Sequence, residues 1–206
     1  MSNIKHFFEQ SWLLIVSSFF FGLLIAVANA AWSERIVQNE IDKRNRLMTD
    51  LIADANSFDV AAQAVEIPDT KAKVVKTDIY RALDGSGRTV GFAFIAVGSG
   101  FQDKIKLVIA VDGKCEKFLG FKVLASNETP GFGDKIKDSY FSSQFRDAPA
   151  GKLQLVKTGD DKKIDSEIVA ISGATVSSEA VVKIFNTYID TVREHLQTKG
   201  SAGNGK

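Results

Sequence analysis

The sequence predicts an α+β protein with one N-terminal transmembrane helix, followed by a single domain with a mostly antiparallel sheet and flanking helices. Three observations lead to this prediction. An uncharged apolar run lies near the N-terminus, short strand-like segments separated by turns fill the middle, and an amphipathic segment closes the chain. The chain has 206 residues, so about 170 remain after the apolar run, which is a typical length for one domain.

The apolar run at residues 11–33 is predicted to be a transmembrane helix because it carries no charge. A span needs about 20 apolar residues, and Trp12 and Trp32 bracket this one as interfacial anchors. A cleaved signal peptide is the alternative, since residues 28–30 (Ala-Asn-Ala) resemble a cleavage site. We favour a retained helix, because the run is longer than the apolar core of most signal peptides.

A stalk helix is predicted at residues 34–56, continuing the transmembrane helix. Its apolar residues share one face and its charged residues occupy the other, as in an amphipathic helix. The apolar face is formed by Val37, Ile41, Met48 and Leu51.

The main domain is expected over residues 57–198, before a flexible tail at residues 199–206. Strands are predicted at residues 73–80, 89–97, 105–111, 118–124, 153–156 and 168–171. The third and fourth of these should form a hairpin across Asp112 and Gly113. A helix is expected after Gly133, through Phe141 and Phe145.

Glycines at 98 and 100 follow the predicted strand at residues 89–97. A nucleotide-binding fingerprint would need a third glycine and a following helix, and neither is present. We therefore interpret residues 98–100 as a plain turn.

The last helix is predicted from apolar residues that recur every three or four positions: Val181, Ile184, Phe185, Tyr188, Val192 and Leu196. Ser177 is the predicted N-cap, with Val176 and Val181 as a hydrophobic staple. A helix start with free N–H groups and nearby hydroxyls suits a phosphate, so Thr175 is a candidate phosphate position. A turn that binds nothing is the alternative.

Composition excludes several classes of function. The net charge is +1 and no basic stripe stands out, so no nucleic acid partner is expected. A single cysteine, Cys115, permits neither an intramolecular disulfide nor a cysteine-ligated iron–sulfur cluster within the chain. The two histidines, His6 and His195, lie far apart in sequence, so no metal site is expected. No Ser-His-Asp set or carboxylate pair indicates catalytic residues.

The run Ser172-Gly173-Ala174-Thr175, followed by Ser177 and Ser178, resembles the attachment motif of the FMN-binding domain family. In that family the motif threonine carries FMN through a phosphodiester bond, which a separate flavin transferase forms with FAD as the donor. The resemblance implies one covalent FMN on Thr175. It also implies that Ser172, Gly173 and Ala174 shape the turn, with Ser177 close to the cofactor.

A second signature of the same family is matched by Glu128-Thr129-Pro130-Gly131-Phe132-Gly133. Proline restricts its own φ, and glycine allows backbone conformations and close approaches that other residues do not. The resemblance implies that Glu128, Thr129, Pro130, Gly131 and Gly133 border the isoalloxazine ring.

The chain as a whole resembles the G subunits of Rnf-type (Rsx-type) electron transport complexes, of which the C subunits of Na+-pumping NADH:quinone reductases are longer relatives. This implies an electron-transfer subunit between ferredoxin and NAD in a complex that translocates Na+ or H+. Its partners would be membrane, iron–sulfur and flavin subunits, and it would have no catalytic activity of its own.

The same resemblance places the main domain on the periplasmic side of the bacterial inner membrane, with residues 1–10 as a short cytoplasmic N-terminus. A short N-terminus agrees with this orientation. The positive-inside rule disagrees, because Lys5 precedes the span whereas Arg35 and Arg44 are among several positive charges that follow it.

Two alternatives remain open. One is a membrane-anchored module without flavin, since the family motif usually has an acidic residue where this chain has Val169, and a histidine shortly before the residue that matches Glu128. The other is a flavin protein that donates electrons to a different extracytoplasmic reductase.

Overall fold

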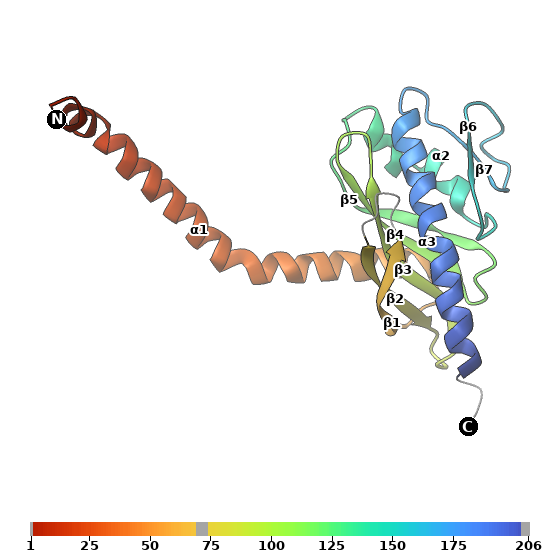
Figure 1. The fold of residues 1–206 in the computed structure, drawn as a ribbon. Coiled ribbons are helices and arrows are strands. Elements are labelled where there is room, and N and C mark those ends of the chain that lie inside the picture. Colours follow the sequence, from red (N-terminus) through yellow and green to blue (C-terminus); the bar gives the residue numbers. More distant parts are fainter. Residues whose placement is uncertain (1, 69–73, 203–206) are drawn as a thin grey trace. The chain divides into compact units, whose positions relative to one another are not determined.

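The structure is a computed structural model that describes residues 2–68 and 74–202. The chain forms two compact units with their boundary after Lys43. Helix α1 (Ser2–Leu51) runs from the first unit into the second without interruption (Figure 1). Residues 2–10 are therefore helical as well, and the stalk helix ends at Leu51, before its predicted end at residue 56.

Helix α1 is the one helix of the described residues that is long and apolar enough to cross a membrane. Its candidate segment, Ser11–Leu51, has a mean hydropathy of 2.3 in its apolar window, and none of that window is buried within the protein. Apolar side chains left exposed along such a length match the requirement for contact with lipid.

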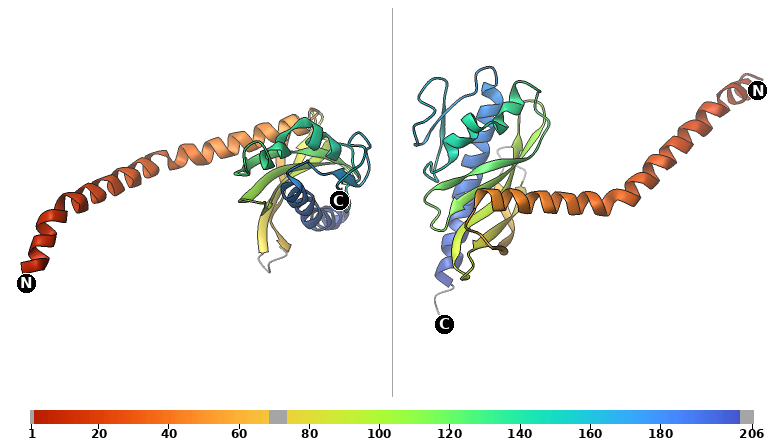
Figure 2. Two further views of the ribbon diagram at one scale, coloured as in Figure 1. Left: turned by 90° about the horizontal axis from the view of Figure 1, so that it is seen from above. Right: turned by 180° about the vertical axis from the view of Figure 1, so that it is seen from behind.

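Five antiparallel strands form the main sheet in the order of the sequence. They are β1 (Ser57–Pro68), β2 (Val74–Leu83), β3 (Thr89–Ser99), β4 (Lys104–Asp112) and β5 (Phe118–Ser126). Helix α3 (Thr175–Ala202) crosses one face of this sheet (Figure 1). Figure 2, left, looks almost along α3 and shows the sheet to one side of it. The predicted fold class is thus confirmed.

Both faces of the sheet are buried, and the side chains of β4 alternate between the two buried clusters. Leu107, Ile109 and Val111 belong to the core beneath α3. Val108 and Ala110 point to the other face, where they join a second cluster with the last turns of α1. Successive strand residues point to opposite faces, so this central strand is apolar throughout.

Strand β1 was not expected from the sequence. Its pairing with β2 shifts register between Val60 and Ala62 and again between Ala62 and Val65. Ala64 within this stretch has a φ of +50°. Each shift interrupts the two-residue period on which strand recognition depends, so the pattern predicts no strand here.

The predicted helix through Phe141 and Phe145 is broken into short pieces. They are the 3₁₀ helix η1 (Gly133–Lys137), α2 (Ser139–Ser142) and the 3₁₀ helix η2 (Ser143–Phe145). Asp138 causes the break between η1 and α2, because its backbone is extended, with φ −69° and ψ 146°.

Strands β4 and β5 pair antiparallel as predicted, and residues 113–117 connect them. The Asp112 carboxylate accepts the N–H groups of Glu116 at 2.7 Å and Lys117 at 2.9 Å, and Cys115 has a φ of +55°. Burial chiefly, and then the charge of Asp112, raise the pKa of Cys115 to about 11, so its thiol is neutral at physiological pH.

The two remaining strands, β6 (Gln154–Val156) and β7 (Glu167–Val169), pair in parallel as a separate two-stranded sheet. The second of them leads directly to α3. Helix α3 reaches Ala202, so the first residues of the predicted tail are helical, and residues 203–206 lie outside the described residues.

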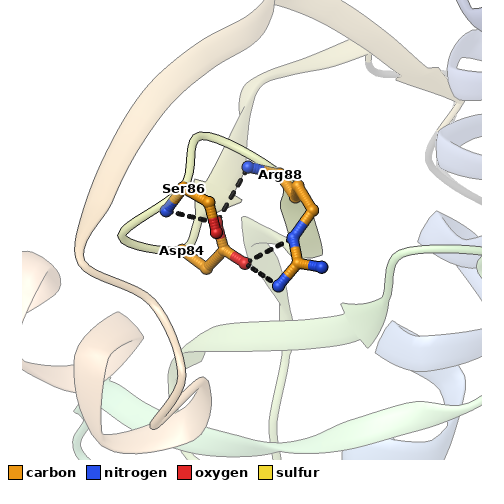
Figure 3. Close-up of polar contacts among 3 residues, drawn as sticks. All are labelled: Asp84, Ser86 and Arg88. Atoms are coloured by element: carbon orange, nitrogen blue, oxygen red, sulfur yellow. Dashed lines mark hydrogen bonds and ion pairs between the residues drawn. The ribbon is translucent and has the colours of Figure 1, made fainter.

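Asp84 organises the turn between β2 and β3 (Figure 3). Its Oδ1 accepts the N–H groups of Ser86 at 2.8 Å and Arg88 at 2.9 Å, and its Oδ2 accepts Nε of Arg88 at 2.9 Å. The bond from the Arg88 N–H contributes most to lowering the pKa of Asp84 from 3.8 to about 2.

We expect Asp84 to contribute stability that is present above pH 3.8 and is lost as the pH falls through about 2. The reason is that the unfolded chain takes up this proton at a higher pH than the folded chain. In urea unfolding of the detergent-solubilised protein, Asp84→Asn should therefore lose less stability than wild type across this interval. Equal losses would contradict the assignment.

Candidate functional site

A tight turn connects β7 to α3 and ends at Thr175. Gly173 has a φ of +79°, and the N–H of Ala174 donates to the carbonyl of Ile171 at 3.0 Å. The buried Ser178 hydroxyl accepts the N–H of Ile171 at 3.0 Å and donates to the carbonyl of Ala174 at 3.0 Å. Ser178 thus closes the turn and leaves the half-buried Thr175 as the first residue of α3.

The predicted N-cap at Ser177 is wrong, because α3 already begins at Thr175. The Ser177 hydroxyl donates to the Glu128 carboxylate instead. No staple forms either, since Val176 is 52% exposed while Val181 is buried. Within the described residues, the N–H groups of residues 175–177 have no protein acceptor, which leaves the helix start open to an anion.

Glu128 lies beneath this helix start and is only 5% exposed. Besides the Ser177 hydroxyl, its carboxylate accepts three successive backbone N–H groups, from Phe101 at 3.2 Å, Gln102 at 3.1 Å and Asp103 at 3.5 Å. Glu128 therefore joins the loop between β3 and β4, the segment after β5 and the first turn of α3.

The surroundings of Glu128 have opposite effects on its pKa. Burial raises the pKa, whereas the hydrogen bonds from Ser177 Oγ and the backbone N–H groups of residues 101–103 lower it. The net pKa lies below the ordinary value of a glutamate, so the carboxylate is ionised at neutral pH.

A cavity of about 460 Å³ opens between these three segments. Its walls come from Phe101 in the loop between β3 and β4, from the segment after β5, and from the start of α3. Of the residues predicted from the sequence, those that line the cavity are Thr129, Gly133, Gly173, Ala174, Thr175 and Ser177. The other predicted site residues, which do not line it, are Ser172, Glu128, Pro130 and Gly131.

Two positions of the segment after β5 require glycine, each for a different structural reason. Gly131 has a φ of +77°, and a Cβ there would meet no atom within 4 Å, so its conformation and not crowding requires glycine. At Gly133 a Cβ would lie 2.6 Å from Ser177 Oγ and 2.9 Å from Glu128 Oε2. Only glycine at 133 lets this segment lie directly against α3.

Three lining residues were missed by sequence reasoning. Phe101, Phe132 and Val176 line the cavity although they are 66%, 56% and 52% exposed. Two of them lie inside or beside the family motifs, but Phe101 follows the glycines that were interpreted as a plain turn. A large aromatic residue directly after a glycine-rich turn was the available signal.

Val169, which stands where the family motif usually has an acidic residue, lies on β7 and does not line the cavity. The N–H of Val169 donates a hydrogen bond to Oε1 of Gln144 at 2.7 Å. The carbonyl of Val169 accepts a hydrogen bond from Nε2 of the same glutamine at 3.3 Å. The backbone at this position is therefore held independently of the Val169 side chain.

A second, more open hollow of about 840 Å³ also includes Thr175. Lys157 and Lys183 line it, together with polar side chains such as Asn186. Thr175 thus lies at the border between the aromatic-lined cavity and a hollow that includes charged side chains.

These surroundings fit a flavin nucleotide. The exposed rings of Phe101 and Phe132 suit a flat conjugated ring system, and the open N–H groups at the start of α3 suit a phosphate. The described residues contain no group of three or more His, Cys, Asp or Glu side chains that could hold a metal ion.

Comparison with known proteins agrees with this fit. Residues 100–190 match the model of the FMN-binding domain, a range that contains all three walls of the cavity. Over 172 residues the chain is 31% identical to the G subunit of the proton-translocating ferredoxin:NAD(+) oxidoreductase complex of Clostridium ljungdahlii, covering 82% of this chain and 83% of that protein. The chain belongs to the family of G subunits of ion-translocating oxidoreductase complexes.

Another member of the family, from Methanosarcina acetivorans, is 28% identical over 192 residues, which is 93% of this chain and 97% of that protein. Two solved structures share the fold. NqrC of Shewanella oneidensis has a TM-score of 0.57 and 21% identity, covering 71% of this chain and 73% of that one. The C subunit of the Na(+)-translocating NADH-quinone reductase of Parabacteroides distasonis has a TM-score of 0.56 and 19% identity, covering 79% of this chain and 96% of that one.

Membership of the G-subunit family confirms the resemblance seen in the two sequence motifs. The chain is a subunit of a redox complex, carries an FMN-binding domain and is anchored to a membrane through its apolar helix.

Proposed function

We propose that this G subunit relays electrons through one FMN that is covalently attached to Thr175. The position of Thr175 carries the proposal. Thr175 is the first residue of a 28-residue helix and lines a cavity that includes two phenylalanines, beside N–H groups that have no acceptor among the described residues.

Attachment would replace the phosphoanhydride bond of the FMN half with a phosphoester bond to the Thr175 hydroxyl. With FAD as the donor, the threonine oxygen forms a bond to the phosphorus of the FMN half. The bond between the two phosphates breaks, AMP leaves and the hydroxyl proton is released. No electrons are exchanged, and a flavin transferase would catalyse the step.

The chain's own residues would bind and orient the cofactor. The N–H groups at the start of α3 would stabilise the phosphate, since the helix N-terminus carries partial positive charge. Phe101, Phe132 and Val176 would border the ring and exclude water from it. Bound flavin supplies the redox chemistry, so the protein needs no catalytic side chain of its own.

The names of the relatives suggest the wider reaction. A G subunit from a ferredoxin:NAD(+) oxidoreductase complex supports a place between these two carriers, in a complex that couples electron flow to ion translocation. The partners would be the other membrane, iron–sulfur and flavin subunits of the Rnf-type complex, in addition to the flavin transferase.

The proposal is tested on the protein isolated from its native membrane. Intact mass should equal the chain plus one FMN less one water, and the denatured protein should remain yellow. Flavin that is released on denaturation would contradict the covalent bond, and a colourless chain of unmodified mass would contradict the redox function.

We also propose that α1 remains attached and that the main domain lies on the periplasmic side of the inner membrane. The helix runs without interruption from the apolar segment into the domain, so a cleavage after Ala30 would cut within it. Protease added to spheroplasts should digest the domain but spare a cytoplasmic marker protein. Full protection would contradict the orientation, and a mature N-terminus at Ala31 would contradict retention.

A further inference from the structure

We propose that Glu128 is a positioning residue: its buried carboxylate holds the loop of residues 100–103 so that Phe101 is pre-set as one wall of the cavity. The inference rests on the proposed function only in naming flavin as the occupant. The contacts that carry it are all within the chain, and the family resemblance implied a different role, namely that Glu128 borders the ring.

The strongest support is the number of donors that one side chain gathers. Three consecutive N–H groups of the loop and the Ser177 hydroxyl all point at the Glu128 carboxylate, and no charged donor from the described part of the chain competes with them. Hydrogen bonds to an ionised acceptor are roughly twice as strong as neutral ones. Without this acceptor, the loop would lose the bonds that define its backbone path.

Two side-chain pairs flank Glu128 and connect the same two segments. Asn127 Nδ2 donates to Oδ2 of Asp103 at 2.9 Å, and Thr129 Oγ1 donates to Oε1 of Gln102 at 3.2 Å. Three successive residues on one segment thus hold three successive residues on the other. We call these six residues, 127–129 and 101–103, the loop clamp.

Glycines provide the space in which the carboxylate fits. A Cβ on Gly100 would clash with Oε1 of Glu128, and a Cβ on Gly133 would lie 2.9 Å from its Oε2. The N–H of Gly100 also donates to the carbonyl of Asp103 at 2.7 Å, which closes the loop on itself. The turn that looked plain in sequence is therefore shaped around Glu128.

Phe101 depends on this clamp because its ring has little packing of its own. The side chain is 66% exposed, so the position of the ring follows the backbone of the loop. An aromatic wall that is already in place reduces the entropy lost when a ring system binds against it. Glu128 does not line the cavity itself, but its carboxylate bonds to Ser177 and Phe101, both of which do.

The test compares Glu128→Gln with Glu66→Gln, which makes the same change at a glutamate of β1 whose side chain is 63% exposed. In the full-length chain produced without flavin, hydrogen–deuterium exchange of the N–H groups at residues 101–103 should quicken at least about tenfold in Glu128→Gln. Exchange in strands β2 to β4 should not change, and Glu66→Gln should match wild type. An unchanged loop in Glu128→Gln overturns the proposal, and so does a general loss of protection in the strands.

A second measurement on the flavin-loaded protein separates positioning from mere folding. In Glu128→Gln the flavin should stay attached, while its visible circular dichroism weakens and its midpoint potential rises, because a nearby negative charge is removed. Phe101→Ala should weaken the dichroism with normal exchange in the loop. An unaltered flavin spectrum in Phe101→Ala overturns the wall assignment.

The two proposals can fail separately. If wild type carries no flavin but the loop of Glu128→Gln still exchanges faster, the proposed function fails and the clamp stands. If wild type carries flavin and the loop is unchanged in Glu128→Gln, the clamp fails and the proposed function stands.

Discussion

Replacing Thr175 with valine should abolish covalent flavin attachment while the domain remains folded. Valine keeps the shape of threonine but has no hydroxyl to form the ester, so the loss should be complete. The change is mild for the fold, since Thr175 is half-buried at the first position of α3. Intact mass should equal that of the unmodified chain, and electron transfer through the assembled complex should stop.

Two matched variants make the Thr175 experiment specific. Thr175→Ser retains a hydroxyl and should keep flavin, at least in part. Ser172→Ala removes an exposed hydroxyl from the same motif and should keep it fully. A flavin-sized mass increase that survives in Thr175→Val would show that a neighbouring hydroxyl, such as that of Ser177 or Ser178, is the attachment point.

The largest loss of stability is expected from Phe185→Ala. Phe185 is fully buried, and its ring centroid lies 4.8 Å from that of Phe118, 5.5 Å from that of Phe121 and 4.6 Å from that of Phe145. Removing it should lower the free energy of unfolding by about 3–5 kcal/mol, because the cavity it leaves lies among rigidly packed rings. Small proteins are stable by only about 5–15 kcal/mol in total.

This loss should appear in thermal unfolding as a Tm lower by roughly 6 to 20 °C. Val74→Ala, at a 59% exposed position of β2, should shift the Tm very little. Since Phe185 joins α3 to β5 and η2, unfolding of the variant should expose the flavin to water while its covalent bond to Thr175 stays intact. A Phe185→Ala protein as stable as the control would mean that α3 is not anchored through this cluster.

Local patterns succeeded where the physical cause is itself local. An uncharged apolar run of sufficient length can be identified as a transmembrane helix without knowledge of the fold. Strands β2 to β5 follow the predicted segments closely, because alternation and turn residues are properties of neighbouring positions. The predictions failed where a local irregularity interrupts the pattern, as at the register shifts of β1 and at extended Asp138.

In the candidate site, too, features with a local cause could be predicted and features that depend on distant residues could not. Thr175 could be named as the candidate position from sequence alone, since the motif around it is a continuous stretch of chain. The N-cap prediction for Ser177 failed because α3 begins two residues earlier, at Thr175, and the Ser177 hydroxyl donates to Glu128, 49 residues away in sequence. Capping rules describe only what neighbours in sequence can do.

By itself, the sequence determined the membrane helix, most of the antiparallel sheet and the residue expected to carry FMN, because each depends on residues that are adjacent or regularly spaced. Only the tertiary structure decided that Phe101 is part of the cavity and that Glu128 supports the loop without lining the site. These roles arise where the loop after β3, the segment after β5 and the start of α3 meet. The geometry of buried hydrogen bonds between such distant segments is set by how the whole sheet and α3 pack together.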